Sequence, residues 1–323
     1  MDLGLVAQNL LTPPILFFVA GVLAVLLRSD LEIPQPLPKL FSLFLLVSIG
    51  FRGGVELRHG LAGTAGLALG AALAMAVAVP VASFYVLRRR VPAPDAAAIA
   101  ATYGSVSAVT FITATAFLDR VGIPYGGHMV AAMALMESPA IVVGVLLLRL
   151  HAPGDGERPR AGALLHDAFL NGSVFLLLAS LAIGLATGDR GRAALAPFTD
   201  GIFVGVLTLF LLDLGIVAGR RMGDLRKAGG FLAAFAVLMP AASAAVAIGL
   251  GLLLRLPLGD ALLLTVLAAS ASYIAVPAAM RIAIPEANPG LFLPLALGVT
   301  FPLNITVGIP VYLWALRTLG AQP

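Results

Sequence analysis

Long apolar stretches separated by short polar connections run through the whole chain. Most stretches are close to twenty residues long, which is the length of helix that crosses the hydrocarbon core of a bilayer. A helix is the expected structure for each stretch, because it satisfies its backbone hydrogen bonds internally. The pattern predicts ten spans, at residues 10–27, 40–51, 61–87, 96–118, 129–148, 168–187, 198–219, 229–254, 260–280 and 291–316.

An internal repeat is visible when the sequence is shifted by 165 residues without a gap. The shift aligns RVPAPDAAAIAATYGSVS (90–107) with RLPLGDALLLTVLAASAS (255–272), and six of these eighteen pairs are identical. A unit of five helices crosses the bilayer an odd number of times, so its second copy starts from the opposite side. The sequence therefore predicts an all-α integral membrane protein with a 5+5 inverted repeat, an architecture typical of secondary transporters. Glycines of the second and seventh spans share the same offset: Gly50 with Gly215, and Gly54 with Gly219.

The repeat divides the chain into a first unit at 1–150, a polar linker at 151–166 and a second unit at 167–323. If the N-terminus lies outside, thirteen of the twenty Lys and Arg residues fall in the inner connections. By the positive-inside rule, both termini are expected on the non-cytoplasmic side of a bacterial inner membrane, with the linker inside.

Composition supports the membrane assignment and removes several function classes. Hydrophobic residues make up 60% of the chain and charged residues 11%, with a mean hydropathy of +1.03. Cysteine is absent, so no thiol nucleophile and no cysteine-based zinc site is expected. The chain shows no Walker loop, HExxH or G-x-S-x-G motif. We therefore expect no enzyme activity, no transition metal and no organic cofactor, and the dispersed basic residues indicate lipid rather than nucleic acid as a partner.

Hydroxyl side chains interrupt the fourth and ninth spans at matching positions. The fourth span reads ATYGSVSAVTF (101–111) and the ninth reads ASASYIAVP (269–277). Where a helix is broken inside a membrane, freed backbone groups and hydroxyls replace water around a small ion. The alternative is that small residues allow close helix packing, with each hydroxyl bonded one turn back. The transport interpretation predicts a substrate site made of Gly104, Ser105, Ser107, Ser270, Ser272 and Tyr273.

The fifth span contains Glu137 next to Pro139. A carboxylate at membrane depth is costly unless it is partnered or functional. Cation coordination, proton coupling, gating and a structural hydrogen bond are all open for it. Its approximate counterpart in the tenth span is neutral and includes Asn304. The predicted sodium ligands are therefore Ser107, Thr110, Glu137, Ser272 and Asn304.

Other polar residues receive structural interpretations. Asp213 lies within the seventh span, and we expect it to pair with Arg52 of the second span as a structural or gating ion pair. The histidines fall at or near predicted helix ends without ligand spacing and are expected at the surface or the membrane interface: His59, His128, His151 and His166.

The chain resembles the sodium-dependent bicarbonate transport permeases first described in cyanobacteria, over essentially its whole length. The resemblance rests on LLVSIGFRGGVELR, YGSVSAVT, MESPAIVVG, LGIVAGRRMGDLRK and LAASASYIAVPAAMRIAIPEANPG. It implies ten helices, with helices 1, 2, 6 and 7 as a scaffold or gate and helices 3–5 and 8–10 as a transport core that holds sodium and bicarbonate. It also implies a trimer and, in the family, a PII-like regulator. This chain departs from the cyanobacterial pattern at Tyr273 and Ala275, which stand where those members have polar groups.

The functional hypothesis is a sodium-driven bicarbonate symporter that works by alternating access. A sodium- or proton-coupled carrier of another small anion or monocarboxylate is the first alternative. A channel-like or structural membrane protein is the second alternative. Saturable, gradient-dependent uptake would exclude this alternative.

Overall fold

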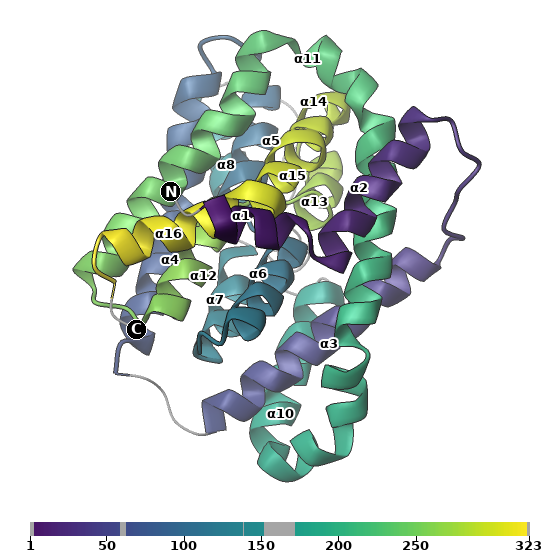
Figure 1. The fold of residues 1–323 in the computed structure, drawn as a ribbon. Helices are drawn as coiled ribbons and strands as arrows, with labels where there is room; N and C mark the ends of the chain where they lie inside the picture. Colours follow the sequence, from purple (N-terminus) through teal and green to yellow (C-terminus); the bar gives the residue numbers. More distant parts are fainter. Residues whose placement is uncertain (1–2, 59–62, 138, 152–171, 322–323) are drawn as a thin grey trace.

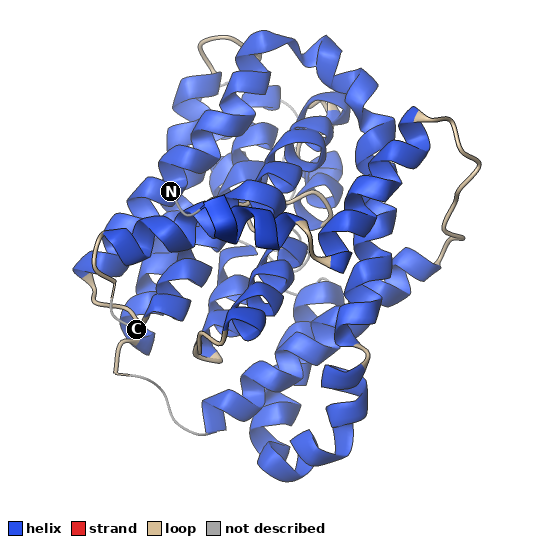
Figure 2. Ribbon diagram, in the orientation of Figure 1, coloured by secondary structure: helices blue, strands red, loops and turns tan. Residues whose placement is uncertain are grey.

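The computed structural model describes residues 3–58, 63–137, 139–151 and 172–321, and these residues form helices and connections with no strand (Figures 1 and 2). Seven of the described helical stretches are long and apolar enough to cross a membrane. The sixth and seventh predicted spans share one of them, Val174–Met222, and the first and ninth correspond to shorter apolar helices. The chain is thus an all-α, multi-pass membrane protein.

The first half of the molecule contains eight described helices. The break between α5 and α6 falls inside the predicted fourth span. The elements are α1 (Leu3–Leu10), α2 (Pro13–Leu26), α3 (Leu37–Arg58), α4 (Ala65–Leu87), α5 (Ala93–Gly104), α6 (Ala108–Val121), α7 (His128–Glu137) and α8 (Pro139–His151).

The second half contains a second break, between α12 and α13. The last span includes π-helical turns, which are rare and frequently occur at functional sites. The elements are α10 (Gly172–Ala196), η1 (Pro197–Gly201), α11 (Phe203–Leu253), α12 (Leu258–Ala268), α13 (Ala275–Ala283), α14 (Pro289–Leu295), η2 (Ala296–Thr300), α15 (Phe301–Leu303), η3 (Asn304–Gly308) and α16 (Ile309–Thr318). Helix α11 is kinked at Gly229, where φ is +82°.

Glycine allows the long helices on one side of the molecule to pack with their backbones in contact. Helix α3 packs along α10, and α2 packs along the first part of α11 (Figure 1). A Cβ atom on Gly50 would collide with the Leu177 carbonyl of α10, and one on its counterpart Gly215 would collide with the Phe18 carbonyl of α2. The glycines matched by the 165-residue offset therefore make comparable contacts in the two halves.

Two aspartates connect the halves in the same way. Helices α5 and α12 each begin directly after a proline and carry an aspartate in the first turn. Asp95 Oδ1 accepts a hydrogen bond from the N–H of Asn288 at 2.8 Å, and Asp260 Oδ1 accepts one from the N–H of Gly126 at 2.7 Å. Asp95 thus binds the connection before α14 in the second half, and Asp260 binds the connection before α7 in the first half.

The prediction for His128 is wrong. Its side chain is only 2% exposed, and its Nε2 atom lies 3.3 Å from Asp260 Oδ2. The Asp260 carboxylate thus faces the imidazole inside the protein, although Nε2 makes no hydrogen bond of good geometry among the described residues. His151 is half-buried at the end of α8, where its ring lies 3.3 Å from the Tyr85 hydroxyl. His59 and His166 lie outside the described residues.

The predicted pair of Arg52 and Asp213 is also wrong. Arg52 Nη2 lies 2.7 Å from Asp119 Oδ2 at the end of α6, and its Nε lies 3.5 Å from Asp200 Oδ1 in η1. Asp213 is ten residues into α11, so it lies about 15 Å deeper along that helix at 1.5 Å per residue. Arg52 therefore pairs with the acids at its own depth.

Candidate functional site

The break between α5 and α6 and the break between α12 and α13 meet in the interior. The N–H of Ser272 donates to the carbonyl O of Thr102 at 2.9 Å. The N–H of Ser107 donates to the hydroxyl of Ser270 at 3.0 Å. These four residues are at most 3% exposed. Each break therefore satisfies part of the backbone of the other, in a region that membrane lipid would leave without hydrogen-bond partners.

The two hydrogen bonds occupy positions related by the 165-residue offset. Ser270 donates its own hydroxyl hydrogen to the carbonyl O of Leu267 at 2.8 Å, and Leu267 is the counterpart of Thr102. One link between the breaks is thus direct, while the other passes through a hydroxyl. The counterpart of Ser270 is Ser105, whose hydroxyl donates instead to the carbonyl O of Glu137 at 3.0 Å.

Serines also accept hydrogen bonds from the starts of the two half-helices that follow the breaks. The hydroxyl of Ser107 accepts hydrogen bonds from the N–H and the hydroxyl of Thr110 at 3.2 and 2.9 Å. The hydroxyl of Ser272 accepts one from the N–H of Val276 at 3.3 Å. Because a helix N-terminus carries partial positive charge and unpaired N–H groups, both starts favour a nearby anion.

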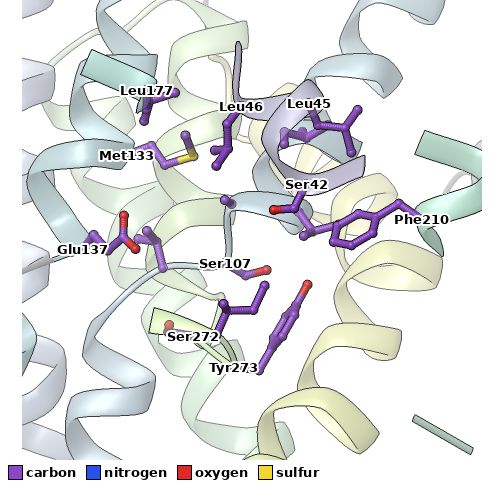
Figure 3. A pocket seen from close by; sticks show the side chains of 15 residues that line it. Ser42, Leu45, Leu46, Ser107, Met133, Glu137, Leu177, Phe210, Ser272 and Tyr273 are labelled. Carbon is purple, nitrogen blue, oxygen red and sulfur yellow. The ribbon is translucent and has the colours of Figure 1, made fainter. Parts of the chain in front are cut away.

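A cavity lies next to the breaks. Its volume is about 40 Å³, which is room for roughly three water molecules. The cavity is lined by Ser107, Ser272, Tyr273 and Glu137. Figure 3 shows these residues with the mostly apolar residues of the opposite wall. That wall comes from α3, α10 and α11, so the cavity lies between the broken helices and the long glycine-packed helices. Its members are Ser42, Leu45, Leu46, Leu177 and Phe210.

Tyr273 contributes a buried hydroxyl that points toward the Ser107 hydroxyl (Figure 3) but makes no hydrogen bond of good geometry among the described residues. Buried hydroxyls in proteins are nearly always hydrogen-bonded, so this one has hydrogen-bonding capacity left for a ligand in the cavity. Glu137 is half-buried at the end of α7 and contributes the cavity's carboxylate. The cavity thus offers hydroxyl donors and one acidic group in an otherwise apolar wall.

The remaining predicted site residues support the breaks and do not line the cavity. Gly104 packs against the ring of Pro80 in α4, where a Cβ atom would collide. Asn304 donates from Nδ2 to the carbonyl O of Ala269 at 2.8 Å and accepts from the Tyr312 hydroxyl at 2.7 Å. The hydrogen bonds above give Ser105, Ser270 and Thr110 similar supporting positions.

Sequence reasoning missed Ser42, which lines the cavity from α3. The available signal was a hydroxyl inside the apolar segment KLFSLFLLVSIG. Serines are common in membrane helices, so that signal alone did not separate Ser42 from Ser48, which is fully buried and does not line the cavity.

Comparison with known proteins adds a family assignment to this geometry. A family model described as the Na⁺-dependent bicarbonate transporter superfamily matches residues 13–317 of the 323-residue chain. The comparison with curated proteins gave no match.

Proposed function

The chain belongs to the Na⁺-dependent bicarbonate transporter superfamily, and from this membership we propose that it imports bicarbonate across the bacterial inner membrane in symport with sodium. The observation that carries the proposal is the pair of hydrogen-bonded helix breaks, whose two following half-helices begin with serine hydrogen bonds beside one cavity. Intramembrane sites of secondary transporters are typically built from such discontinuous helices.

Bicarbonate matches the donors at the cavity. It is a small, planar anion with three oxygen atoms, and the cavity presents the hydroxyls of Ser107, Ser272 and Tyr273. The N-terminal ends of α6 and α13 add N–H groups and partial positive charge. Hydroxyls and helix ends hold an anion without a fixed countercharge, so the empty site carries no unpaired arginine or lysine at membrane depth.

Sodium matches the acidic and carbonyl groups of the same region. The carboxylate of Glu137 lines the cavity, and the C-terminal ends of α5 and α12 direct carbonyl groups, with partial negative charge, toward the breaks. A hard cation such as sodium prefers oxygen ligands of this kind. Binding both ions together reduces the charge that either would carry alone into a medium of low dielectric, which gives symport its physical reason.

Alternating access follows from a 5+5 inverted repeat, which we propose as the architecture. The offset-related glycine contacts and the two aspartate links support it. In this proposal α2, α3, α10 and the first part of α11 form the gate, and the broken helices with their neighbours form the transport core. Movement of the core against the gate exposes the cavity to one side and then to the other.

The test is uptake of labelled bicarbonate into proteoliposomes, at fixed pH and matched membrane potential, with and without an inward sodium gradient. We expect saturable uptake that requires sodium, and none in protein-free liposomes. Uptake that rises linearly with bicarbonate concentration would instead indicate a channel. Absence of uptake by folded, inserted protein would reject bicarbonate as the substrate.

A short monocarboxylate is the second candidate substrate. The apolar wall formed by Leu45, Leu46 and Phe210 faces the hydroxyls across the cavity, and a methyl group would pack against it. Competition separates the candidates: unlabelled formate or acetate inhibits bicarbonate uptake only if the site accepts monocarboxylates.

A further inference from the structure

A second cavity is lined by residues near the ends of α3, α6 and α10, and by the connection before α7; these helices are labelled in Figure 1. The volume of this cavity is about 190 Å³. In the proposed orientation it faces the non-cytoplasmic side, and we call it the outer vestibule. Its charged and polar lining residues are Arg52, Glu56, Asp119, Tyr125 and Arg192.

An apolar layer separates the outer vestibule from the central cavity. Along α3, Leu46 lines the central cavity and Ile49 lines the vestibule; along α7, Met133 lines the central cavity and Val130 the vestibule. In each helix the two residues are three apart, slightly less than one helical turn. All four side chains are buried. Parting α3 from α7 at this layer would therefore join the two cavities.

The vestibule also contains the groups that hold α3 against the core helices. Arg52 of α3 pairs with Asp119 of α6, with 2.7 Å between Nη2 and Oδ2. One residue further along α3, Gly53 touches the connection before α7, where a Cβ atom on Gly127 would collide with the Gly53 carbonyl. On this side the gate and the core are thus held together by a close backbone contact and by an ion pair that crosses between them.

The ion pair has no counterpart at the positions related to it by the repeat. The 165-residue offset relates Arg52 to Val217 and Asp119 to Ile284, which carry no charge. The glycine contacts and aspartate links occur in both halves, so the inverted architecture does not itself require this pair. A role specific to the outer face accounts for the difference.

The chemistry of the pair suggests that role. A guanidinium group binds carboxylate through paired N–H donors, and bicarbonate presents a planar oxyanion of the same type. The Arg52 and Asp119 side chains are 21% and 40% exposed, and Nη1 of Arg52 has no hydrogen-bond partner among the described residues. Water reaches both side chains and screens the pair, and Asp200 stays 3.5 Å from Nε of Arg52 when another oxyanion takes the place of Asp119, so the guanidinium keeps a countercharge during the exchange.

We propose that Arg52 is an outer binding site for small planar oxyanions, and that an incoming anion opens the outer gate by replacing Asp119 on the guanidinium. The choice of bicarbonate as the physiological anion rests on the proposed function. The anion itself thus weakens the tie between gate and core as it arrives, and the freed core exposes the central cavity to it.

Gate opening is measurable without transport. The chain has no cysteine, so Val130→Cys introduces a single thiol in the apolar layer. Its rate of modification by a membrane-impermeant thiol reagent reports opening from the outer side. At fixed pH and sodium concentration we compare chloride, formate and bicarbonate. We expect bicarbonate and formate, but not chloride, to accelerate modification.

The ion pair is tested in the same Val130→Cys background. Asp119→Asn is expected to raise the rate in chloride about fivefold, the upper range for an exposed ion pair, and to remove the response to bicarbonate. Glu32→Gln is the matched control, because it breaks an equally short ion pair of 2.7 Å with Arg220 away from the vestibule. It should leave both the rate and the response unchanged.

The outcomes separate the two proposals. An unchanged rate in Asp119→Asn, or no response of Val130→Cys to either oxyanion, overturns the exchange at Arg52. A response to formate without one to bicarbonate supports the oxyanion site and rejects bicarbonate as the anion that opens the gate. A response to bicarbonate in protein that takes up none in proteoliposomes supports the site and rejects the transport proposal.

Discussion

Ser107 and Ser272 each use one hydroxyl for two purposes. Each accepts hydrogen bonds from the start of the half-helix that follows it, and each lines the central cavity. A hydroxyl that accepts from the backbone still has its own hydrogen to donate, and an anion in the cavity is a strong acceptor. The cap therefore orients the donor toward the ligand.

Replacing both serines should weaken binding more than stability. For Ser107→Ala with Ser272→Ala we expect the half-saturating bicarbonate concentration to rise on the order of tenfold, because each hydrogen bond contributes about 0.5–1.5 kcal/mol net. Uptake kinetics in proteoliposomes measure it. Thr113→Ala is the matched control, since it removes a buried hydroxyl of α6 that donates to Val109 and does not line the cavity. Equal kinetics in the double variant and the wild type would refute the assignment.

Glu137 is the second residue whose role is testable alone. Glu137→Gln keeps the size of the side chain and removes its charge, so a cation held by the carboxylate loses a charged ligand. We expect the half-saturating sodium concentration to rise at least about tenfold, since interactions with charged groups contribute about 1.5–3 kcal/mol. The measurement is initial uptake rate against sodium concentration. An unchanged sodium curve would leave Glu137 a structural role.

At the scale of elements, the sequence was sufficient to predict the two breaks. Gly104, the serine clusters and Pro277 interrupt apolar segments at matching positions, and this signal is local. The hydrogen bonds between the breaks are not local: Ser107 meets Ser270 across 163 residues, and Thr102 meets Ser272 across a similar distance. Side-chain direction at a break depends on backbone torsions that sequence periodicity does not fix.

The same limit explains the residues whose partners were mispredicted. The repeat places Arg52 and Asp213 on related spans, but the sequence does not give the depth at which each side chain lies. The position of His128 near a helix end predicts a surface side chain, whereas Asp260 comes from the start of another helix and faces it. A polar residue at a helix end is exposed only if no other element covers that end.

At the scale of the whole molecule, the two aspartate links bear on how the transport core moves. Asp260 ties α12 to the connection before α7, and Asp95 ties α5 to the connection before α14. Each link joins a broken helix of one half to the other half. If the core moves against the gate as one body, these links hold its halves together while Arg52 releases Asp119.

Removing the two links should therefore destabilise the protein unequally. Asp260→Ala leaves the N–H of Gly126 without its acceptor and His128 without its carboxylate, in a position only 1% exposed. We expect a loss of about 1.5–3 kcal/mol, the range for a hydrogen bond to a charged group. Asp95 is half-buried and makes the equivalent bond to the exposed Asn288, so Asp95→Ala should cost less because water replaces the lost carboxylate. Thermal unfolding in detergent measures both variants, and an equal or reversed order would show that burial does not set the strength of these links.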